Sequence, residues 1–307
     1  MRQSLRLRAL IWGLRSFEKP YLARETDVSR ARRRLRFAAR FFLAPRGVPW
    51  REMRLGALRA LDIGPPADHT FSVLLWFHGG AFVQGAPETH RKLGQALARH
   101  WKVRVILPEY RLAPEHPFPA AWEDALAAYR ALVQELPVDR IILGGDSAGG
   151  GLAFALIPMI RAAGLAMPAG VVGISPWADM TLESPTLAAN AAADPMLPVD
   201  RMAEIRDMVL AGADPRDPRA SPVLADFSGA PPALLIGGTG EILAGDIDRL
   251  FERFCAANAR VELQHFPGDV HVLPMFFGWV PEAGEALARA AGFVGAMRRR
   301  FWMRGAG

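Results

Sequence analysis

The sequence has little of several features that would place it in other classes of protein. Its 307 residues contain one cysteine, Cys255, so an internal disulfide and a cysteine-based metal site are both excluded. No run reaches the roughly 18 uninterrupted apolar residues of a membrane-spanning helix, and arginines interrupt the apolar residues of 1–8 too early for a secretory signal. Glycine and proline follow no period, and no internal repeat is visible. We therefore expect a cytoplasmic globular protein without stable membrane insertion.

Positive charge is concentrated in the first 54 residues. This segment has an excess of eleven positive charges, whereas the whole chain has a net charge of +6, so the remainder is net negative. The strongest run, Arg30 to Arg36, would suit nucleic acid or an anionic membrane surface. Its arginines are interleaved with apolar residues at helical spacing, which is more typical of the solvated face of an amphipathic helix. We favour that interpretation and expect no nucleic-acid partner.

From about residue 71 the chain alternates short apolar runs with helical stretches. This pattern is typical of a mostly parallel sheet covered on both faces by helices, which is the α/β class. The predicted strands are Phe71–Phe77, Val103–Leu107, Ile141–Gly144, Val171–Ser175, Ala233–Gly237 and Val261–Phe266. The predicted helices cover about 88–100, 119–136, 149–164, 244–259 and 281–300.

Two regions fall outside this alternation. Residues 1–45 are helical and basic in pattern, and 178–218 is rich in Ala, Pro, Asp and Met, with one helix expected near 199–211. Both stand where a lid can cover the carboxyl edge of the sheet. We predict a catalytic domain formed by 46–177 and 219–307, and a discontinuous helical cap formed by 1–45 and 178–218.

A serine flanked by glycines, Ser147, stands in the run Gly-Asp-Ser-Ala-Gly-Gly at 145–150, between a predicted strand and a predicted helix. Such a turn holds its serine at strained dihedral angles, and it needs glycines because side chains there would collide with the neighbouring strand and helix. The backbone N–H of Ala148, at the helix N-terminus, can stabilise negative charge. A phosphate-binding turn is disfavoured, because no Lys-Ser/Thr follows and no dinucleotide spacing is present. We predict that Ser147 is a nucleophile.

The predicted strand Phe71–Phe77 is followed by His-Gly-Gly-Ala-Phe at 78–82. A glycine loop after an early strand can turn successive backbone N–H groups toward one point. We predict an oxyanion hole formed by the N–H groups of Gly79, Gly80 and Ala148. His78 is expected to be structural and to bond the backbone of this loop.

These motifs resemble those of the bacterial hormone-sensitive-lipase-like (family IV) esterases. The resemblance spans roughly residues 45–295 and rests on the runs at 78–81, 109–121, 145–150, 175–179, 194–195 and 217–222, and on the region around His271. It implies the α/β-hydrolase fold with a helical cap, no metal and no cofactor, and a small-molecule ester with a short or medium acyl chain as substrate. Relatives that are dimers suggest a possible homodimer. Ala81 stands where the family commonly has a third glycine, but its backbone N–H is unchanged.

Two histidines follow Ser147, and in this fold the nucleophile precedes the acid and then the histidine. His265 lies in the alternating run 261–266, which is typical of the surface of a strand. His271 lies in the loop after that last strand, where an imidazole can reach Ser147. We predict His271 as the base.

The acid is expected in the loop after strand Ala233–Gly237. Similar proteins often have an aspartate thirty residues before the histidine, and this position holds Glu241. Asp246 is the alternative, but it falls one turn into the next helix, where a capping or salt-bridge role is more natural. The resemblance therefore favours a Ser-His-Glu triad.

Two aromatic residues, Phe82 and Trp177, either line the acyl pocket or belong to the core. The predicted function is hydrolysis of carboxylic esters through an acyl-enzyme. Two alternatives stay open. The same triad also suits amide or formamide hydrolysis, and receptors that resemble this family bind small molecules without catalysis. Such receptors have lost the catalytic histidine, whereas this chain has His271.

Overall fold

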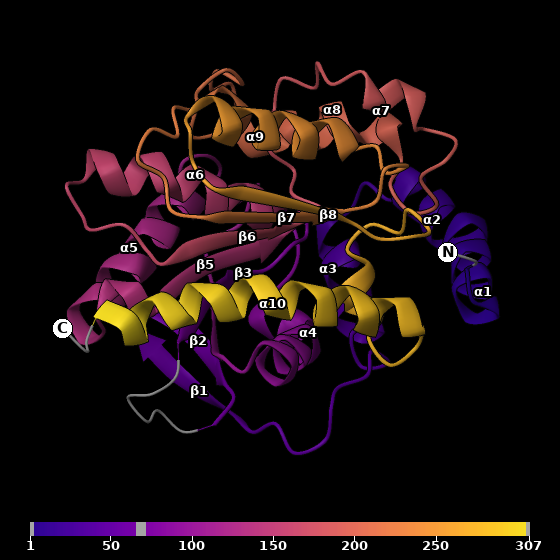
Figure 1. Ribbon diagram of the computed structural model, residues 1–307. Helices are drawn as coiled ribbons and strands as arrows, with labels where there is room; N and C mark the ends of the chain where they lie inside the picture. Colours follow the sequence, from indigo (N-terminus) through magenta and orange to yellow (C-terminus); the bar gives the residue numbers. More distant parts are fainter. Residues whose placement is uncertain (1–2, 66–71, 305–307) are drawn as a thin grey trace.

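The computed structural model describes residues 3–65 and 72–304, and in these ranges the strands form an eight-stranded sheet (Figure 1). The strand order is β1-β2-β4-β3-β5-β6-β7-β8. Strands β3 to β8 pair in parallel, whereas β2 is antiparallel to both β1 and β4. The strands are β1 Trp50–Leu55, β2 Leu58–Ile63, β3 Val73–Phe77, β4 Arg104–Pro108, β5 Ile141–Asp146, β6 Gly170–Ile174, β7 Ala233–Gly237 and β8 Val261–His265. The predicted α/β class with a mostly parallel sheet is confirmed.

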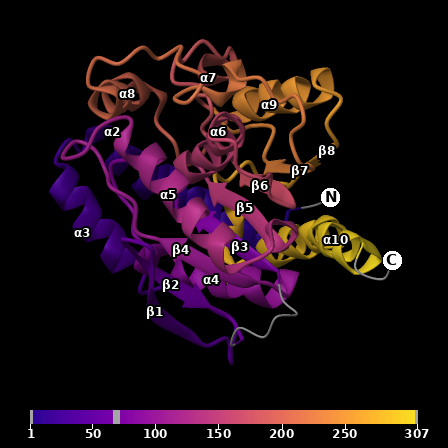
Figure 2. The same cartoon turned by 90° about the vertical axis from the view of Figure 1, so that its left-hand side faces the viewer.

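Helices cover both faces of this sheet: α4 and α10 lie on one face, and α5, α6 and α9 on the other (Figures 1 and 2). The α-helices are α1 Leu5–Gly13, α2 Lys19–Arg24, α3 Val28–Ala38, α4 Pro87–Trp101, α5 Ala120–Glu135, α6 Ala148–Ala162, α7 Thr186–Ala189, α8 Met202–Leu210, α9 Ala244–Ala256 and α10 Pro281–Arg304. A π-helical stretch, η1, covers Leu14–Glu18, and short 3-10 helices cover η2 Val138–Arg140, η3 Val199–Arg201, η4 Pro222–Leu224 and η5 Leu273–Phe276.

Strand β3 shows why the central strands are apolar throughout. All five of its side chains are buried. Leu75 and Phe77 join the core cluster beneath α5, α6 and α9, while Leu74 and Trp76 join the cluster beneath α4 and α10. Successive side chains of a strand point to opposite faces, so a strand covered on both faces needs apolar residues at every position.

The predicted strands and helices are found with shifts of a few residues at their ends, although Phe71 lies outside the described residues. The hairpin of β1 and β2 was not predicted. Its strands mix charged with apolar residues, and β1 is mostly exposed at the sheet edge. The expected helix near 199–211 is present as η3 and α8, and the short α7 was not predicted.

The basic N-terminal segment is helical, as expected, but several of its cations bind other parts of the chain. Arg32 pairs with Glu115 at 2.7 Å. Lys19 Nζ donates to the carbonyl oxygens of Ala191 and Asp194, each at 2.6 Å. The two Lys19 bonds join 1–45 to the segment 178–218, and Figure 1 shows α2 and α7 of these segments toward the same side of the molecule. Within the described ranges, no helix has the length and hydropathy needed to cross a bilayer.

Candidate active site

Ser147 occupies a sharp turn between β5, which ends at Asp146, and α6, which begins at Ala148. Its backbone angles, φ 53° and ψ −125°, are strained for a residue with a side chain. The turn leaves no room around it: a Cβ on Gly149 would lie 2.0 Å from the carbonyl oxygen of Phe77. Glycine at position 149 is therefore a steric requirement of this turn.

His271 lies in the loop after β8, and Glu241 lies in the loop after β7. The Nδ1 atom of His271 is 2.8 Å from Oε2 of Glu241, and both side chains are buried. An Nδ1 that faces a carboxylate carries the proton, which leaves Nε2 with its lone pair. Among the described residues Nε2 has no hydrogen-bond partner, and His271 lines the same cavity as Ser147. The imidazole thus has its Nδ1 occupied by Glu241 and its Nε2 unoccupied, and it lines a cavity together with Ser147.

The pKa of His271 results from two opposing effects. Burial lowers it, because a charged imidazolium loses its hydration. The hydrogen bond and negative charge of Glu241, together with the charges of Asp194 and Asp146, raise it by more. The net result is a pKa above the ordinary value of 6.5. The site therefore favours the imidazolium form, which is the form that a proton transfer to His271 produces.

The second carboxylate oxygen of Glu241, Oε1, is held by two donors. The backbone N–H of Gly238 donates to it at 2.6 Å, and the hydroxyl of Ser175 donates at 2.9 Å. Ser175 Oγ in turn accepts from the N–H of Val272, beside His271, at 3.2 Å. Ser175 thus links the loops of the acid and the histidine. Its sequence position, at the carboxyl end of a predicted strand, did not by itself indicate this role.

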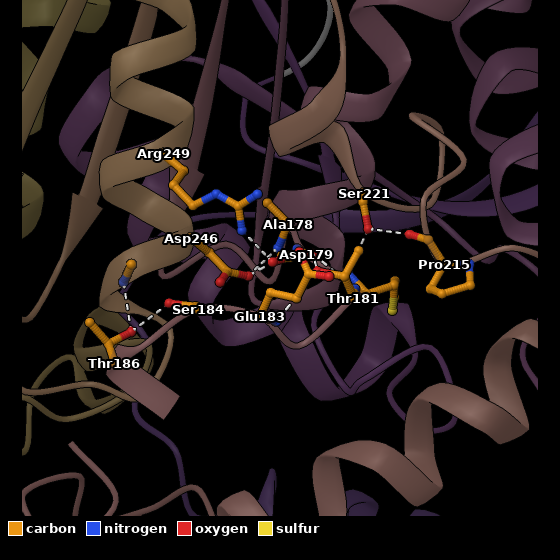
Figure 3. A network of polar contacts seen from close by, with 12 residues as sticks. Ala178, Asp179, Thr181, Glu183, Ser184, Thr186, Pro215, Ser221, Asp246 and Arg249 are labelled. Carbon is orange, nitrogen blue, oxygen red and sulfur yellow. Dashed lines mark hydrogen bonds and ion pairs between the residues drawn. The ribbon is translucent and has the colours of Figure 1, made fainter. Parts of the chain in front are cut away.

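Asp246, the alternative acid, lies in the first turn of α9 and points toward another loop (Figure 3). Its Oδ2 accepts hydrogen bonds from the backbone N–H groups of Ala178 at 2.8 Å and Asp179 at 3.0 Å. Burial is the main cause that raises the pKa of Asp246 to about 8. Asp179 also forms an ion pair with Arg249. Asp246 therefore supports the loop that carries Trp177, and it does not contact His271.

Asp194 connects the segment 178–218 to the acid loop. Its Oδ1 accepts from the backbone N–H groups of Met196 and Leu197, each at 2.8 Å. Its Oδ2 accepts from the N–H of Ile242, the neighbour of Glu241, at 3.0 Å. In the sequence, this position was indicated only by the family resemblance at 194–195. Its carboxylate ties the cavity wall to the loop that orients the histidine.

The loop after β3 differs from the prediction at Gly79. The N–H of Gly79 donates to Oδ2 of Asp146 at 3.1 Å and to Nε2 of His90 at 3.2 Å, so it is not free to bind an oxyanion. Gly80 and Ala81 have positive φ angles of 120° and 55°. Among the described residues the N–H groups of Gly80, Ala81 and Ala148 have no partner. Gly79 instead buttresses the turn that holds Ser147.

His78 has the structural role expected from the sequence. It is buried, and its Nδ1 lies 2.8 Å from the carbonyl oxygen of Gly79. The hydroxyl of Tyr110 donates to the carbonyl oxygen of His78 at 2.6 Å, and the two rings are stacked. These contacts fix the backbone of the loop. His265, at the end of β8, is exposed on the surface, as predicted.

Two adjoining cavities, with about 820 and 930 Å³ of open space, share Ser147. Residues of both segments 1–45 and 178–218 line them, among them Leu22 and Leu197. Trp177 lines the first cavity, and His271 lines the second. Phe82 does not line either one, contrary to one of its two predicted roles. It is stacked on Trp122, with 4.6 Å between the ring centroids, in the core.

Comparisons with known proteins identify the family of this chain. A family model described as alpha/beta hydrolase fold matches residues 74–275. An acetyl-hydrolase of Streptomyces hygroscopicus is 39% identical over 230 residues, which are 75% of this chain and 77% of that protein. An esterase of Acinetobacter venetianus is 37% identical over 246 residues, or 80% of this chain and 81% of the relative.

Solved structures are similar over nearly the whole length. The crystal structure of EstE5 soaked with p-nitrophenyl butyrate has a TM-score of 0.91 at 33% identity, and covers 96% of this chain and 99% of EstE5. An esterase from the bacterial hormone-sensitive lipase family has a TM-score of 0.89 at 34% identity, with 96% of this chain and 98% of the esterase covered.

Proposed function

This chain belongs to the bacterial hormone-sensitive-lipase-like esterases of the α/β-hydrolase family and is a carboxylesterase of the serine hydrolase type, and we propose which of its residues catalyse the reaction. Ser147, His271 and Glu241 form a triad that hydrolyses esters of short to medium acyl chains through an acyl-enzyme. The observation that supports it most directly is the 2.8 Å contact of His271 Nδ1 with Glu241 Oε2, with Nε2 left free.

In the first step the Ser147 oxygen attacks the ester carbonyl while His271 Nε2 takes the hydroxyl proton. Glu241 stabilises the imidazolium that results. When the tetrahedral intermediate collapses, His271 gives the proton to the departing alkoxide, and the alcohol leaves. In the second step His271 takes a proton from water, and the hydroxide attacks the acyl carbon. The proton then returns to Ser147 as the carboxylic acid leaves.

The oxyanion of each intermediate is bound by the backbone N–H groups of Gly80, Ala81 and Ala148. All three lack a protein partner within the described ranges, whereas Gly79 is occupied by Asp146. Ala148 also stands at the N-terminus of α6, where the helix dipole favours negative charge. A donor of this kind contributes about 100- to 1000-fold to the rate.

The two cavities divide the substrate between them. His271 must protonate the leaving alkoxide, so the alcohol part lies in the second cavity, which His271 lines. The acyl part then lies in the first cavity, beside Trp177. Segments 1–45 and 178–218 act together as the cap over the catalytic domain of 46–177 and 219–307. Lys19 bonds the two cap segments together, and the first cavity, with about 820 Å³ of open space, suits short and medium acyl chains.

Turnover of p-nitrophenyl butyrate tests the triad. Ser147→Ala and His271→Ala are each expected to lower kcat by at least about 10⁴-fold. His265→Ala is the matched control, because this exposed histidine lies outside both cavities, and its rate is expected to equal the wild-type rate. Equal rates for Ser147→Ala and the wild type would refute the assignment. The homodimer stays a prediction, which size-exclusion chromatography with light scattering measures.

A further inference from the structure

Arg201 places a positive charge in the wall of the first cavity, whose lining is otherwise mostly apolar. It is the last residue of η3, and its exposed fraction is only 9%. The same cavity is lined by Ser147, Trp177 and the apolar side chains of Met202 and Ile205. Helices α2 and α8 both contact η3, the element that carries Arg201. A buried guanidinium beside an acyl pocket needs a physical explanation.

The protein itself satisfies only part of this guanidinium. Nη2 donates to Glu204 at 3.1 Å, and the Glu204 side chain is 48% exposed. Nε is buried with no partner, and Nη1 has none among the described residues. Arg32 shows the contrast: it donates to two backbone carbonyl oxygens and to both oxygens of Glu115. Because an unsatisfied buried donor destabilises a protein, the buried Nε of Arg201 points to a ligand, and the partnerless Nη1 of the same guanidinium is a second donor for it.

We propose that Arg201 recognises an oxygen acceptor carried by the acyl chain, so that the enzyme prefers esters of oxo acids to esters of plain fatty acids. This inference rests on the proposed function, because it takes the first cavity as the acyl pocket. With an oxo group in place, the N–H groups of Arg201 gain the acceptor that the protein does not supply. A plain alkyl chain would leave them unsatisfied and would keep water from them.

The oxygen acceptor on the substrate is an uncharged group, because two carboxylates already lie near Arg201. Glu25 lines the same cavity with a side chain that is 7% exposed, and Glu204 already pairs with Arg201. Glu25 itself is held by the hydroxyl of Tyr21 at 3.0 Å and by Arg30 at 3.6 Å. Arg30 and Arg201 already balance these two carboxylates, so a substrate carboxylate would add a negative charge without a matching cation. A ketone oxygen accepts a hydrogen bond without adding charge.

The experiment compares esters that differ only in a carbonyl for a methylene group. The pairs are ethyl 5-oxohexanoate with ethyl hexanoate, and ethyl 4-oxopentanoate with ethyl pentanoate. The acid released during hydrolysis measures the rate. In the wild type we expect kcat/KM for the oxo ester to exceed kcat/KM for the matched plain ester at least about tenfold in one of the pairs. A hydrogen bond to a charged group has an effect of this size. In Arg201→Met the ratio falls to about one. Monoethyl glutarate tests the charge, and it is expected to be a poorer substrate than ethyl 5-oxohexanoate.

The controls separate recognition from folding. Both members of a pair are measured on one preparation, so a loss of folded Arg201→Met cancels in the ratio. Arg201→Lys keeps the charge without the planar fork and is expected to give an intermediate ratio. Glu204→Gln removes the exposed partner, leaves Nε and Nη1 in place, and keeps the wild-type ratio.

A wild-type ratio of one, as when water satisfies Arg201, or an unchanged ratio in Arg201→Met, overturns the proposal. A preference for monoethyl glutarate overturns the neutral acceptor. If the wild type hydrolyses neither these esters nor p-nitrophenyl butyrate, the proposed function itself fails and this inference falls with it.

Discussion

Replacing Glu241 by glutamine turns one carboxylate oxygen into an NH2 group and leaves the side-chain shape intact. In the wild type Oε1 accepts from Gly238 N–H at 2.6 Å and from Ser175 at 2.9 Å, while Oε2 faces His271 Nδ1 at 2.8 Å. An NH2 at the Oε1 position would meet a backbone donor that cannot rotate away. An NH2 at the Oε2 position meets only His271, whose tautomer can change.

Each buried donor left unsatisfied costs about 1–3 kcal/mol. The glutamine oxygen therefore stays at the position with two donors, and the NH2 donates to His271 Nδ1. An Nδ1 that accepts a hydrogen bond carries no proton, so the proton of the neutral ring moves to Nε2. His271 can then no longer take the proton of Ser147. The comparable change of an aspartate to asparagine in a Ser-His-Asp triad lowers kcat about 10⁴-fold, and we expect Glu241→Gln to lower it by about 10³- to 10⁴-fold.

Steady-state hydrolysis of p-nitrophenyl butyrate measures this loss, and thermal unfolding confirms that the variant is folded. Asp246→Asn is the matched control. Its retained Oδ atom keeps the bonds from Ala178 and Asp179, so kcat is expected within a fewfold of the wild type. A kcat of Glu241→Gln within about tenfold of the wild type, or an equal loss of activity in Asp246→Asn, would refute Glu241 as the acid of the triad.

Three further predictions concern the same site. The pKa of His271 is raised above 6.5, and only the neutral imidazole accepts a proton, so kcat/KM increases as the pH rises through that pKa. We therefore expect the acid limb of the pH profile of kcat/KM above pH 6.5. An acid limb at or below pH 6.5 would contradict the ion pair of His271 with Glu241. Ser175→Ala removes a donor to Glu241 and is expected to lower the free energy of unfolding by about 1–3 kcal/mol in urea titration, which an unchanged midpoint would disprove. Gly149→Ala would place a Cβ 2.0 Å from the Phe77 carbonyl oxygen and should abolish turnover, whereas Gly292→Ala, with nothing within 4 Å, should retain it.

The central strands were predictable because burial on both faces makes each of them a continuous apolar run. Strand β7 was found with its observed bounds, Ala233–Gly237, and all its residues are buried. The hairpin of β1 and β2 was missed because its strands are not continuous apolar runs. In β1, Trp50–Leu55, only Leu55 is buried, so its sequence lacks the signal that marks a central strand.

Phe82 and Gly79 show where local patterns stopped being informative. An aromatic residue beside an oxyanion loop suits a pocket wall and a core equally well, and Phe82 packs on Trp122, forty positions away in the chain. Gly79 has the loop position of an oxyanion donor, but its N–H is taken by Asp146 of the nucleophile turn. In both cases a partner distant in the sequence decided the role of the residue.

Local sequence patterns were sufficient to predict the class of sheet and the strand–turn–helix geometry around Ser147, because apolar periodicity and glycine spacing are local properties of the chain. They also placed His271 and Glu241 on loops that end at the same sheet edge. Three features required the folded structure: which carboxylate contacts His271, which N–H groups of the 78–82 loop are free, and how residues of 1–45 and 178–218 line two cavities with Arg201 in one wall. These features depend on contacts between loops brought together by the fold, and no spacing within one segment encodes them.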